Sequence, residues 1–497
     1  MKRSYLCTLI AASLLGAGCS QEFLEPKRDT SILTNEDVAE IAETNPAIIN
    51  GALEGVYSYM VQNRAVTTGH YDFGQKGVDI WMDIVCGDMA LSASAYGWYD
   101  NPANLLSTVD FTRAENRTIW QYYYKVINLS NNVINYIGGN GVTPDTAEGR
   151  HIMGQAKALR AYAYFYLAQL FQREYNPTQP ILPFYNGEIS NYGKVPASQI
   201  YDLIISDLNT SIELLDDYSR DTKYKVNKSV AQGLLAYTYA AMGNYQQARV
   251  FADQVIATSG SPLTTLGQTA FPGTGSGFNN VNTPSWIWGY DITDVMGEQL
   301  INWWGQMDYF TYSYASAGDQ KAIDDALYAA IPPGDVRKTQ FSTSPATLLM
   351  PLNKFFAPAR TWQGQYFITT DYLFMRVDEF YLLSAEAAAR TGDEAAARTR
   401  LAELLTQRLA GGAGAATAYV TGLTGQALQN AIYLQTRIEL WGEGKSYLAM
   451  KRNQATVTRG TNHVFRAGQS FQYNSDELSF QIPQIELNNN PAITEQN

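Results

Sequence analysis

Two segments that lie far apart in the chain share one pattern, a pair of amphipathic helices joined by a tight turn. In residues 228–258, apolar side chains recur at helical spacing on both sides of a Gly-Asn turn. Residues 376–409 repeat the arrangement, with Gly392 placed to end the first helix and Asp393 to cap the second. Because a helical hairpin buries its apolar faces only against neighbouring helices, this pattern predicts a stacked, mostly α-helical protein.

Further segments with helical periodicity extend this body. They cover residues 36–62, 115–137, 147–172, 197–218 and about 424–452. With small residues at the expected helix crossings, the two hairpins resemble tetratricopeptide repeats. We therefore expect a tetratricopeptide-like solenoid built from about 36–258 and 376–452, within a single domain that spans residues 36–497.

The residues between the two halves of the solenoid, about 260–375, have a different composition. Glycine, proline, threonine, asparagine and aromatic residues dominate, and the helical periodicity fades. Residues 285–290 alternate in the manner of a strand, and a Pro-Pro-Gly turn follows at 332–334. This composition predicts an inserted, loop-rich lobe with short strands, which is suited to hold a ligand on a helical scaffold.

The start of the chain has the features of an export signal. A basic pair is followed by an apolar run to Leu15 and by small residues before Cys19. That order is typical of a secretory signal, and a cysteine at its end resembles a bacterial lipobox. We expect residues 1–18 to be a lipoprotein signal peptide and residues 19–35 to be a lipidated Cys19 with a polar tether. Because no later apolar run reaches the ~18 residues of a membrane span, acyl chains alone are expected to hold the protein at a membrane.

Charge and motif content argue against several functions. The formal charge is −12, and lysine and arginine form no concentrated block, which argues against binding to nucleic acid or to an anionic membrane surface. The chain has only three histidines and no HExxH, CxxC, GxSxG or Walker sequence. Metal-dependent hydrolysis and triad chemistry are therefore unsupported, no cofactor is indicated, and we expect a protein that is not an enzyme.

Clustered aspartates are the feature that points toward catalysis. Asp72, Asp79, Asp83 and Asp88 lie near two tryptophans, and glycosidases act through a pair of carboxylates. No spacing singles out an acid and a nucleophile, so solvated, hydrogen-bonding or capping roles are favoured. A structural calcium ion would take oxygen ligands, but no EF-hand pattern supports one. Cys86 has no local base and is interpreted as a buried packing residue.

Most of the nine tryptophans gather in two windows outside the clearest helices. From these windows we choose eight candidate ligand-binding residues: Tyr96, Trp98, Tyr99, Asn101, Trp303, Trp304, Asp308 and Tyr309. Aromatic rings stack on the C–H faces of sugar rings, and neighbouring carboxylate and amide groups hydrogen-bond to hydroxyls. Trp81, Trp286 and Trp288 have apolar neighbours and are interpreted as packing residues.

Several short motifs follow one another along almost the whole chain. They are FLEP after the cysteine, LRAYAYFYLAQLFQ, VPASQIYDLIISDLNTSIELL, the hairpin with GNYQQA, MRVDEFYLLSAEAAARTGD, RIELWGEGKSYLAMKR and a terminal IPQIELNNNP. Each motif alone carries little information. The ordered set resembles the SusD/RagB family of nutrient-binding outer-membrane lipoproteins of Bacteroidetes.

This resemblance implies a mostly α-helical fold with four tetratricopeptide-like units and a less regular ligand lobe. It also implies a lipid-anchored protein at the surface of the outer membrane, which caps a SusC-like TonB-dependent transporter as a hinged lid. The expected function is capture of an oligosaccharide or polysaccharide and its delivery to that transporter. Relatives commonly carry an arginine and an aspartate where this chain has Ser446 and Ala449, so Glu439, Glu443 and Lys445 are expected to make local contacts instead.

Three alternatives to glycan capture stay open at this point. A family member that binds peptides would rely on backbone hydrogen bonds more than on stacked tryptophans. A surface glycoside hydrolase would use the aspartate clusters and would release reducing ends from polysaccharide. A pure scaffold would bind no small ligand, so loss of carbohydrate binding in tryptophan variants would exclude it.

Overall fold

The computed structural model describes residues 37–38, 41, 47–188 and 190–497. The predicted signal segment 1–18, the lipidated Cys19 and the tether up to residue 35 lie outside these described residues. Helices make up most of the regular structure, and the described strands are short and form separate two-stranded sheets. The prediction of a mostly α-helical protein is confirmed.

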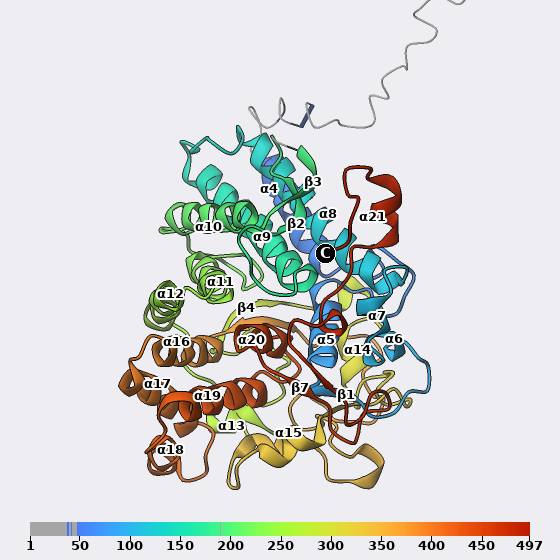
Figure 1. Ribbon diagram of the computed structural model, residues 1–497, viewed down its shortest axis with the longest axis vertical. Helices are drawn as coiled ribbons and strands as arrows, with labels where there is room; N and C mark the ends of the chain where they lie inside the picture. The colour runs from blue at the N-terminus through green and yellow to red at the C-terminus, as the bar shows by residue number, and fades with distance from the viewer. Residues whose placement is uncertain (1–36, 39–40, 42–46, 189) are drawn as a thin grey trace, which may run out of the picture.

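The helical body is a row of helices in which each packs against the next from α4 to α18, and α19 lies against α16. Its members are α4 (Ala47–Met60), α8 (Ala114–Tyr136), α9 (Ala147–Phe171), α10 (Ala197–Leu214), α11 (Lys228–Ala241), α12 (Tyr245–Thr258), α16 (Asp378–Arg390), α17 (Glu394–Thr406), α18 (Gly412–Val420) and α19 (Gly425–Glu439). In Figure 1 they follow one another from the top of the picture to the lower left. Because α12 contacts α16 directly, the row continues across the residues that separate the two hairpins in sequence.

Both predicted hairpins are confirmed. In the first, α11 and α12 are joined by a turn in which the side chain of Asn244 caps α12. In the second, Gly392 has a φ of +85° after α16, and Asp393 accepts a hydrogen bond from the third residue beyond it to cap α17. Ala248 and Ala252 of α12 are fully buried. Their small side chains allow the packed helices to approach closely.

The single helix predicted over about 424–452 is interrupted. A turn separates α19 from α20 (Ser446–Arg452). Gly442 and Gly444 in this turn have φ values of +81° and +71°, which an α-helix does not contain. The turn places Glu443 in the interior, where it is 4% exposed.

Between α12 and α16 the chain forms short elements only. They are α13 (Leu266–Thr269), β4 (Trp286–Tyr290), η1 (Asp294–Met296), α14 (Trp303–Met307), β5 (Lys321–Ile323), α15 (Asp325–Ala330), η2 (Val336–Gln340), η3 (Pro345–Thr347) and β6 (Tyr372–Arg376). The strand expected at residues 285–290 is β4, which pairs antiparallel with β6. β5 pairs with β1 (Met89–Leu91). This second pairing brings the loop that follows β1 beside the inserted segment (Figure 1).

The remaining elements fill and close the core. They are α5 (Gln75–Val85), α6 (Asp100–Ala103), α7 (Leu106–Val109), the β2 (Pro180–Tyr185) and β3 (Ser190–Pro196) hairpin, β7 (Val457–Thr458), β8 (Ser470–Phe471), η4 (Asp476–Leu478) and α21 (Gln484–Asn489). Every residue of α5 is buried. Trp81, Trp286 and Trp288 are core residues, as predicted. Cys86 is buried as well, and burial raises the pKa of its thiol well above the ordinary value.

A buried network of ion pairs joins the inserted segment to the helical body. Its cations are Arg337, Lys354, Arg376 and Arg408, and its carboxylates are Asp335, Asp378, Glu439 and Glu443. Glu439 contacts Arg376 at 2.7 Å and Arg408 at 2.8 Å. Burial opposes its ionisation, but Arg408 and Arg376 hold the pKa of Glu439 well below its usual range. Because charges of both signs balance, removal of one member would leave a buried charge uncompensated.

The expectation of local contacts for Glu439, Glu443 and Lys445 is therefore wrong. The two glutamates bind cations of the inserted segment. Lys445 donates a hydrogen bond of 3.1 Å to the hydroxyl of Tyr166 in α9. Glu439 is buried at the end of α19 itself, and the positive-φ turn that follows places Glu443 and Lys445 in the interior.

Candidate functional site

Four of the predicted ligand-binding residues are buried: Tyr99, Trp303, Trp304 and Asp308. Trp303 and Trp304 are 3% and 0% exposed. They begin α14, which Asn302 caps by accepting a hydrogen bond of 2.9 Å from the N–H of Gly305. A sugar stacks only on an exposed ring face. The burial of these side chains corrects the prediction that they form a surface platform, and they pack the interior instead.

Asp308 anchors two loops to the core. Its carboxylate accepts hydrogen bonds from the N–H of Phe310 (3.0 Å), the hydroxyl of Thr311 (2.7 Å) and the N–H of Ala357 (2.9 Å). Burial raises the pKa of Asp308 to about 6, although these hydrogen bonds act in the opposite direction. Because the carboxylate accepts these hydrogen bonds from within the protein, it holds the backbone of two loops in place and does not face a ligand.

Exposed aromatic side chains gather on three neighbouring loops. They are Tyr96, which the sequence predicted, and Tyr312, Trp362, Tyr366 and Phe367, which it did not; the predicted Trp98 lies beside them. We call these six residues the aromatic loop face. Tyr96, Trp362 and Tyr366 are 59%, 58% and 50% exposed, and Trp98 is half-buried. The rings of Tyr312 and Tyr366 lie 5.4 Å apart between centroids, so neighbouring loops present neighbouring rings.

Hydrogen bonds to the backbone hold these loops together. The carboxylate of Asp319 accepts from the N–H groups of Ala95 and Tyr96 at 2.6 and 2.7 Å. The N–H of Tyr312 donates to the carbonyl of Gln365 at 2.9 Å. The β1–β5 pairing fixes the base of the first loop. A backbone that is already ordered reduces the conformational entropy lost when a ligand binds.

His70 supports the ring of Trp98 from one side. The two rings stack with centroids 4.3 Å apart and an interplanar angle of 12°. Arg64 donates to Nε2 of His70, so the proton of the neutral imidazole lies on Nδ1, which donates to the hydroxyl of Tyr314. Burial, and then the positive charge of Arg64, lower the pKa of His70. The imidazole behind Trp98 is therefore neutral at pH 7.

The remaining two predicted residues, Asn101 and Tyr309, are half-buried. Asn101 donates to the carboxylate of Glu115 at 3.0 Å, and Tyr309 packs edge-on against Phe310. Neither belongs to the aromatic loop face.

The sequence did contain a signal for the residues that were missed. The segment 361–367, Thr-Trp-Gln-Gly-Gln-Tyr-Phe, places aromatic residues beside polar ones around a glycine. The same composition singled out the stretch around Trp98. Trp362 is not among the predicted residues because it stands apart from the two tryptophan windows.

The clustered aspartates have partners within the fold. Asp79 pairs with Lys76 at 2.8 Å, and Asp88 pairs with Arg437 at 2.6 Å. Asp72 accepts hydrogen bonds from backbone N–H groups of the loop that precedes it. In the part of the chain that the structure describes, no group of three or more histidine, cysteine, aspartate or glutamate side chains is arranged to hold a metal ion. The geometry agrees with hydrogen-bonding and ion-pairing roles for these carboxylates.

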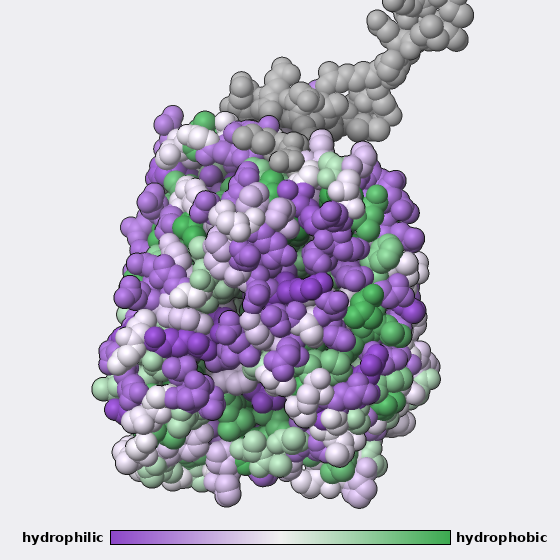
Figure 2. All heavy atoms as spheres, viewed as in Figure 1, coloured by the Kyte–Doolittle hydropathy of each residue, from purple (hydrophilic) through white to green (hydrophobic). Residues whose placement is uncertain are grey.

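On the side of the molecule shown in Figure 2, hydrophilic residues predominate, and hydrophobic ones form smaller patches toward the right and lower edges. Tyrosine and tryptophan combine an apolar ring with a polar atom, so a face made of them is found from the exposure of single rings.

None of the helices among the described residues combines the length and the apolar character that crossing a bilayer requires.

Two family models match separate parts of the chain. Residues 22–240 match the model described as "Starch-binding associating with outer membrane". Residues 333–497 match the model described as "SusD family". The two matched ranges include the loops that carry Trp98 and Trp362.

Individual relatives agree with these matches. The SusD-like protein P2 of Formosa agariphila is 29% identical over 140 residues, which are 28% of this chain and 26% of that protein. The match thus spans about a quarter of that relative. Among solved structures, a SusD-like carbohydrate binding protein from Bacteroides vulgatus superposes with a TM-score of 0.74 at 24% identity, covering 90% of this chain and 97% of that one. A SusD superfamily protein from Bacteroides thetaiotaomicron gives a TM-score of 0.69 at 20% identity, covering 94% and 100%. At such identities the similarity establishes the fold.

Proposed function

Because this chain belongs to the SusD/RagB family, we propose that it binds a glycan on its aromatic loop face without covalent chemistry. The observation that carries the proposal is the set of exposed rings on hydrogen-bonded loops. Stacking on such rings provides affinity for the C–H faces of sugars. A solved relative of the same fold is itself a SusD-like carbohydrate binding protein.

The arrangement of the rings favours an oligomer over a single sugar. Tyr312 and Tyr366 lie next to each other with an interplanar angle of 33°. Tyr96 packs edge-on against Tyr314, at an interplanar angle of 71°. Because the rings come from separate loops and face different directions, successive sugar units can each contact a ring. The exposed Arg64 supplies hydrogen-bond donors beside Trp98.

We further propose that Cys19 carries the lipid that holds the protein at the outer membrane, and that the bound oligomer passes to a SusC-like TonB-dependent transporter. The lipobox-like sequence supports the anchor, and the matched description of outer-membrane association supports the location. Labelling of cells with an alkyne fatty acid should mark the wild-type protein and fail to mark Cys19→Ala. Co-purification of a barrel-sized partner with the wild-type protein tests the delivery step.

Calorimetry tests the binding function. The chain from residue 20 onward, which contains every described residue, is titrated with starch, xylan, galactomannan, pectin and laminarin, and with tryptic peptides of casein. We expect heat with one glycan class. Heat with peptides alone would favour the peptide-binding alternative, and release of reducing ends would favour a hydrolase. A Trp362→Ala/Tyr366→Ala double variant, in which both altered side chains are exposed, tests whether the aromatic loop face is the place of binding.

A further inference from the structure

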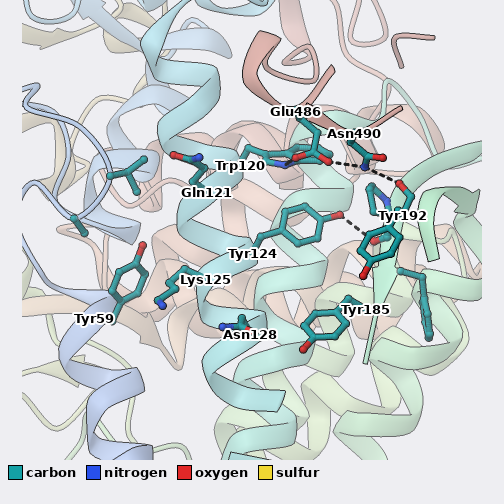
Figure 3. Close-up of a pocket in the computed structure, with 14 residues that line it drawn as sticks. Tyr59, Trp120, Gln121, Tyr124, Lys125, Asn128, Tyr185, Tyr192, Glu486 and Asn490 are labelled. Carbon is teal, nitrogen blue, oxygen red and sulfur yellow. Dashed lines mark hydrogen bonds between the residues drawn. The ribbon is translucent and has the colours of Figure 1, made fainter. Parts of the chain in front are cut away.

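A cavity with aromatic walls borders the segment that carries Arg64 and His70, apart from the aromatic loop face. It has a volume of about 560 Å³ and lies between α8, the β2–β3 hairpin, α21 and residues 65–66. Figure 3 shows Tyr59 and Lys125 on one side of it, Tyr185 and Tyr192 on the other, and Trp120, Glu486 and Asn490 above them. Sites for small ligands typically measure about 300–1,000 Å³, so the cavity is of ligand size.

Hydrogen bonds between distant parts of the chain fix the aromatic walls. The hydroxyl of Tyr124 donates to the carbonyl of Pro183 at 2.9 Å. The indole N–H of Trp120 donates to the carboxylate of Glu486 at 3.2 Å. The amide of Asn490 donates both to that carboxylate (2.7 Å) and to the backbone carbonyl of Tyr192 (2.8 Å). These bonds attach α21 and the β hairpin to α8, so the cavity is formed before any ligand enters.

Polar groups without protein partners also reach this cavity. Within the described residues, the side chains of Lys125 and Asn128 make no hydrogen bond or ion pair. Gln121 accepts from Arg117 through its oxygen, which leaves its amide N–H groups available. The ring of Tyr192, 69% exposed, stands at the opening. Aromatic walls combined with a few available donors are what a hydroxylated ring requires.

We propose that this cavity is a second carbohydrate site, which binds a short neutral segment of the same glycan that contacts the aromatic loop face. The inference rests on the function proposed above. Lys125 and Glu486 are the charged residues that line the cavity, and their charges cancel. The acidic chain as a whole also disfavours a polyanion. A neutral sugar therefore fits better than an acidic or sulfated one.

The position of the cavity allows one glycan to contact both sites. Ala65 and Val66 line the cavity, while His70 of the same segment stacks on Trp98 and Arg64 donates to its imidazole. A glycan long enough to reach both places binds more tightly than either site alone allows, because the second contact becomes intramolecular. Among the residues that the structure describes, Glu486 is the only carboxylate that lines the cavity, and because glycosidases require two, binding without hydrolysis is expected there.

Fluorine NMR of the protein labelled with 5-fluorotryptophan tests both sites at once. Trp120→Phe and Trp98→Phe assign the two reporter signals among the nine tryptophans. The probes are maltohexaose, cellohexaose, xylohexaose and mannohexaose. We expect one hexasaccharide to shift the signals of both Trp98 and Trp120.

A pair of matched variants separates the two sites. Tyr192→Ala should weaken the response of Trp120 about fivefold and that of Trp98 by less, because at Trp98 only the intramolecular gain is lost. Tyr366→Ala, which changes a tyrosine that is 50% exposed on the aromatic loop face, should do the reverse. A shift of Trp98 with a silent Trp120, or a Trp120 response that Tyr192→Ala leaves unchanged, would overturn the second site while the proposed function stands. Silence of both signals with every hexasaccharide would contradict the two proposals together.

Discussion

Trp303 and Trp362 have nearly the same sequence neighbours and opposite environments. The first stands in Trp-Trp-Gly-Gln and is 3% exposed, whereas the second stands in Trp-Gln-Gly-Gln and is 58% exposed. The difference teaches that local composition marks an aromatic loop but does not decide whether its rings face the core or the solvent. That decision depends on the contacts that the backbone makes with distant residues.

Several contacts fix the backbone around the buried Trp303 and Trp304. Asn302 caps the short helix α14, and Asp308 after it accepts hydrogen bonds from two loops. Gly305 packs so closely on residue 300 that a Cβ would lie 1.9 Å from the carbonyl oxygen of Leu300. The segment 361–367 is bound to a neighbouring loop as well, since the N–H of Gly364 donates to the carbonyl of Phe310 at 2.9 Å, but its rings extend outward.

The largest expected effect is on the buried side of the comparison. Trp304→Ala removes a fully buried ring that also donates to the carbonyl of Asp371. We expect a loss of about 3–5 kcal/mol in the free energy of unfolding, measured by urea denaturation. Trp362→Ala is the matched variant, and should change stability by less than about 0.5 kcal/mol. Equal losses of unfolding free energy in the two variants would contradict the distinction between the buried Trp304 and the exposed Trp362.

Asp308 provides a pH-dependent version of the same test. Burial raises the pKa of its carboxyl from 3.8 to about 6. The folded state therefore binds more protons at Asp308 than the unfolded state between these values, so the contribution of this carboxyl to stability is greatest below about pH 4 and is lost as the pH rises through 6. Relative to Asp308→Asn, the wild-type protein should lose about 3 kcal/mol between pH 4 and pH 7. Parallel stability profiles for the two proteins would show that the carboxyl is not buried.

The helical hairpins were predictable because the signals that specify them lie close together in the sequence. Each hairpin has its own periodicity, a turn residue and a cap such as Asp393, and these signals act within a few residues of one another. The break at Gly442 was missed, since a glycine inside a helical pattern does not by itself reveal a positive φ. The buried ion network was missed too, because Glu439 meets Arg376 and Arg408 only when β6 and the end of α17 pack against α19.

The candidate site was predictable only in part for the same reason. Tyr96 and Trp98 were found from their polar and glycine neighbours. The loops of Tyr312 and Tyr366 meet through a hydrogen bond between residues 312 and 365, a contact that no local pattern encodes.

A medium effect is expected on the exposed side of the comparison. Tyr366→Ala removes a half-exposed ring that lies beside Tyr312. The loss of one stacking contact, about 1 kcal/mol, should weaken glycan binding about fivefold. Affinity electrophoresis in gels that contain the polysaccharide measures the change. An unchanged migration with an unchanged melting temperature would remove Tyr366 from the site.

The smallest effect concerns the support behind Trp98. The pKa of His70 lies below its ordinary value of 6.5, so its contribution to stability is present above pH 6.5 and is lost as the pH falls through the lowered pKa. Protonation also removes the acceptor that Arg64 uses. We expect glycan affinity to fall about twofold between pH 7 and pH 5, and to be independent of pH in His70→Asn. The same pH dependence in both proteins would assign it to another group.

The most direct measurement is a calorimetric titration of the Trp362→Ala/Tyr366→Ala variant with the glycan that gives heat in the wild-type protein. Both side chains are exposed, so the melting temperature serves as an internal check on folding. We predict that the affinity falls at least about tenfold while the melting temperature stays the same. Wild-type affinity in this variant would contradict the aromatic loop face as the glycan site.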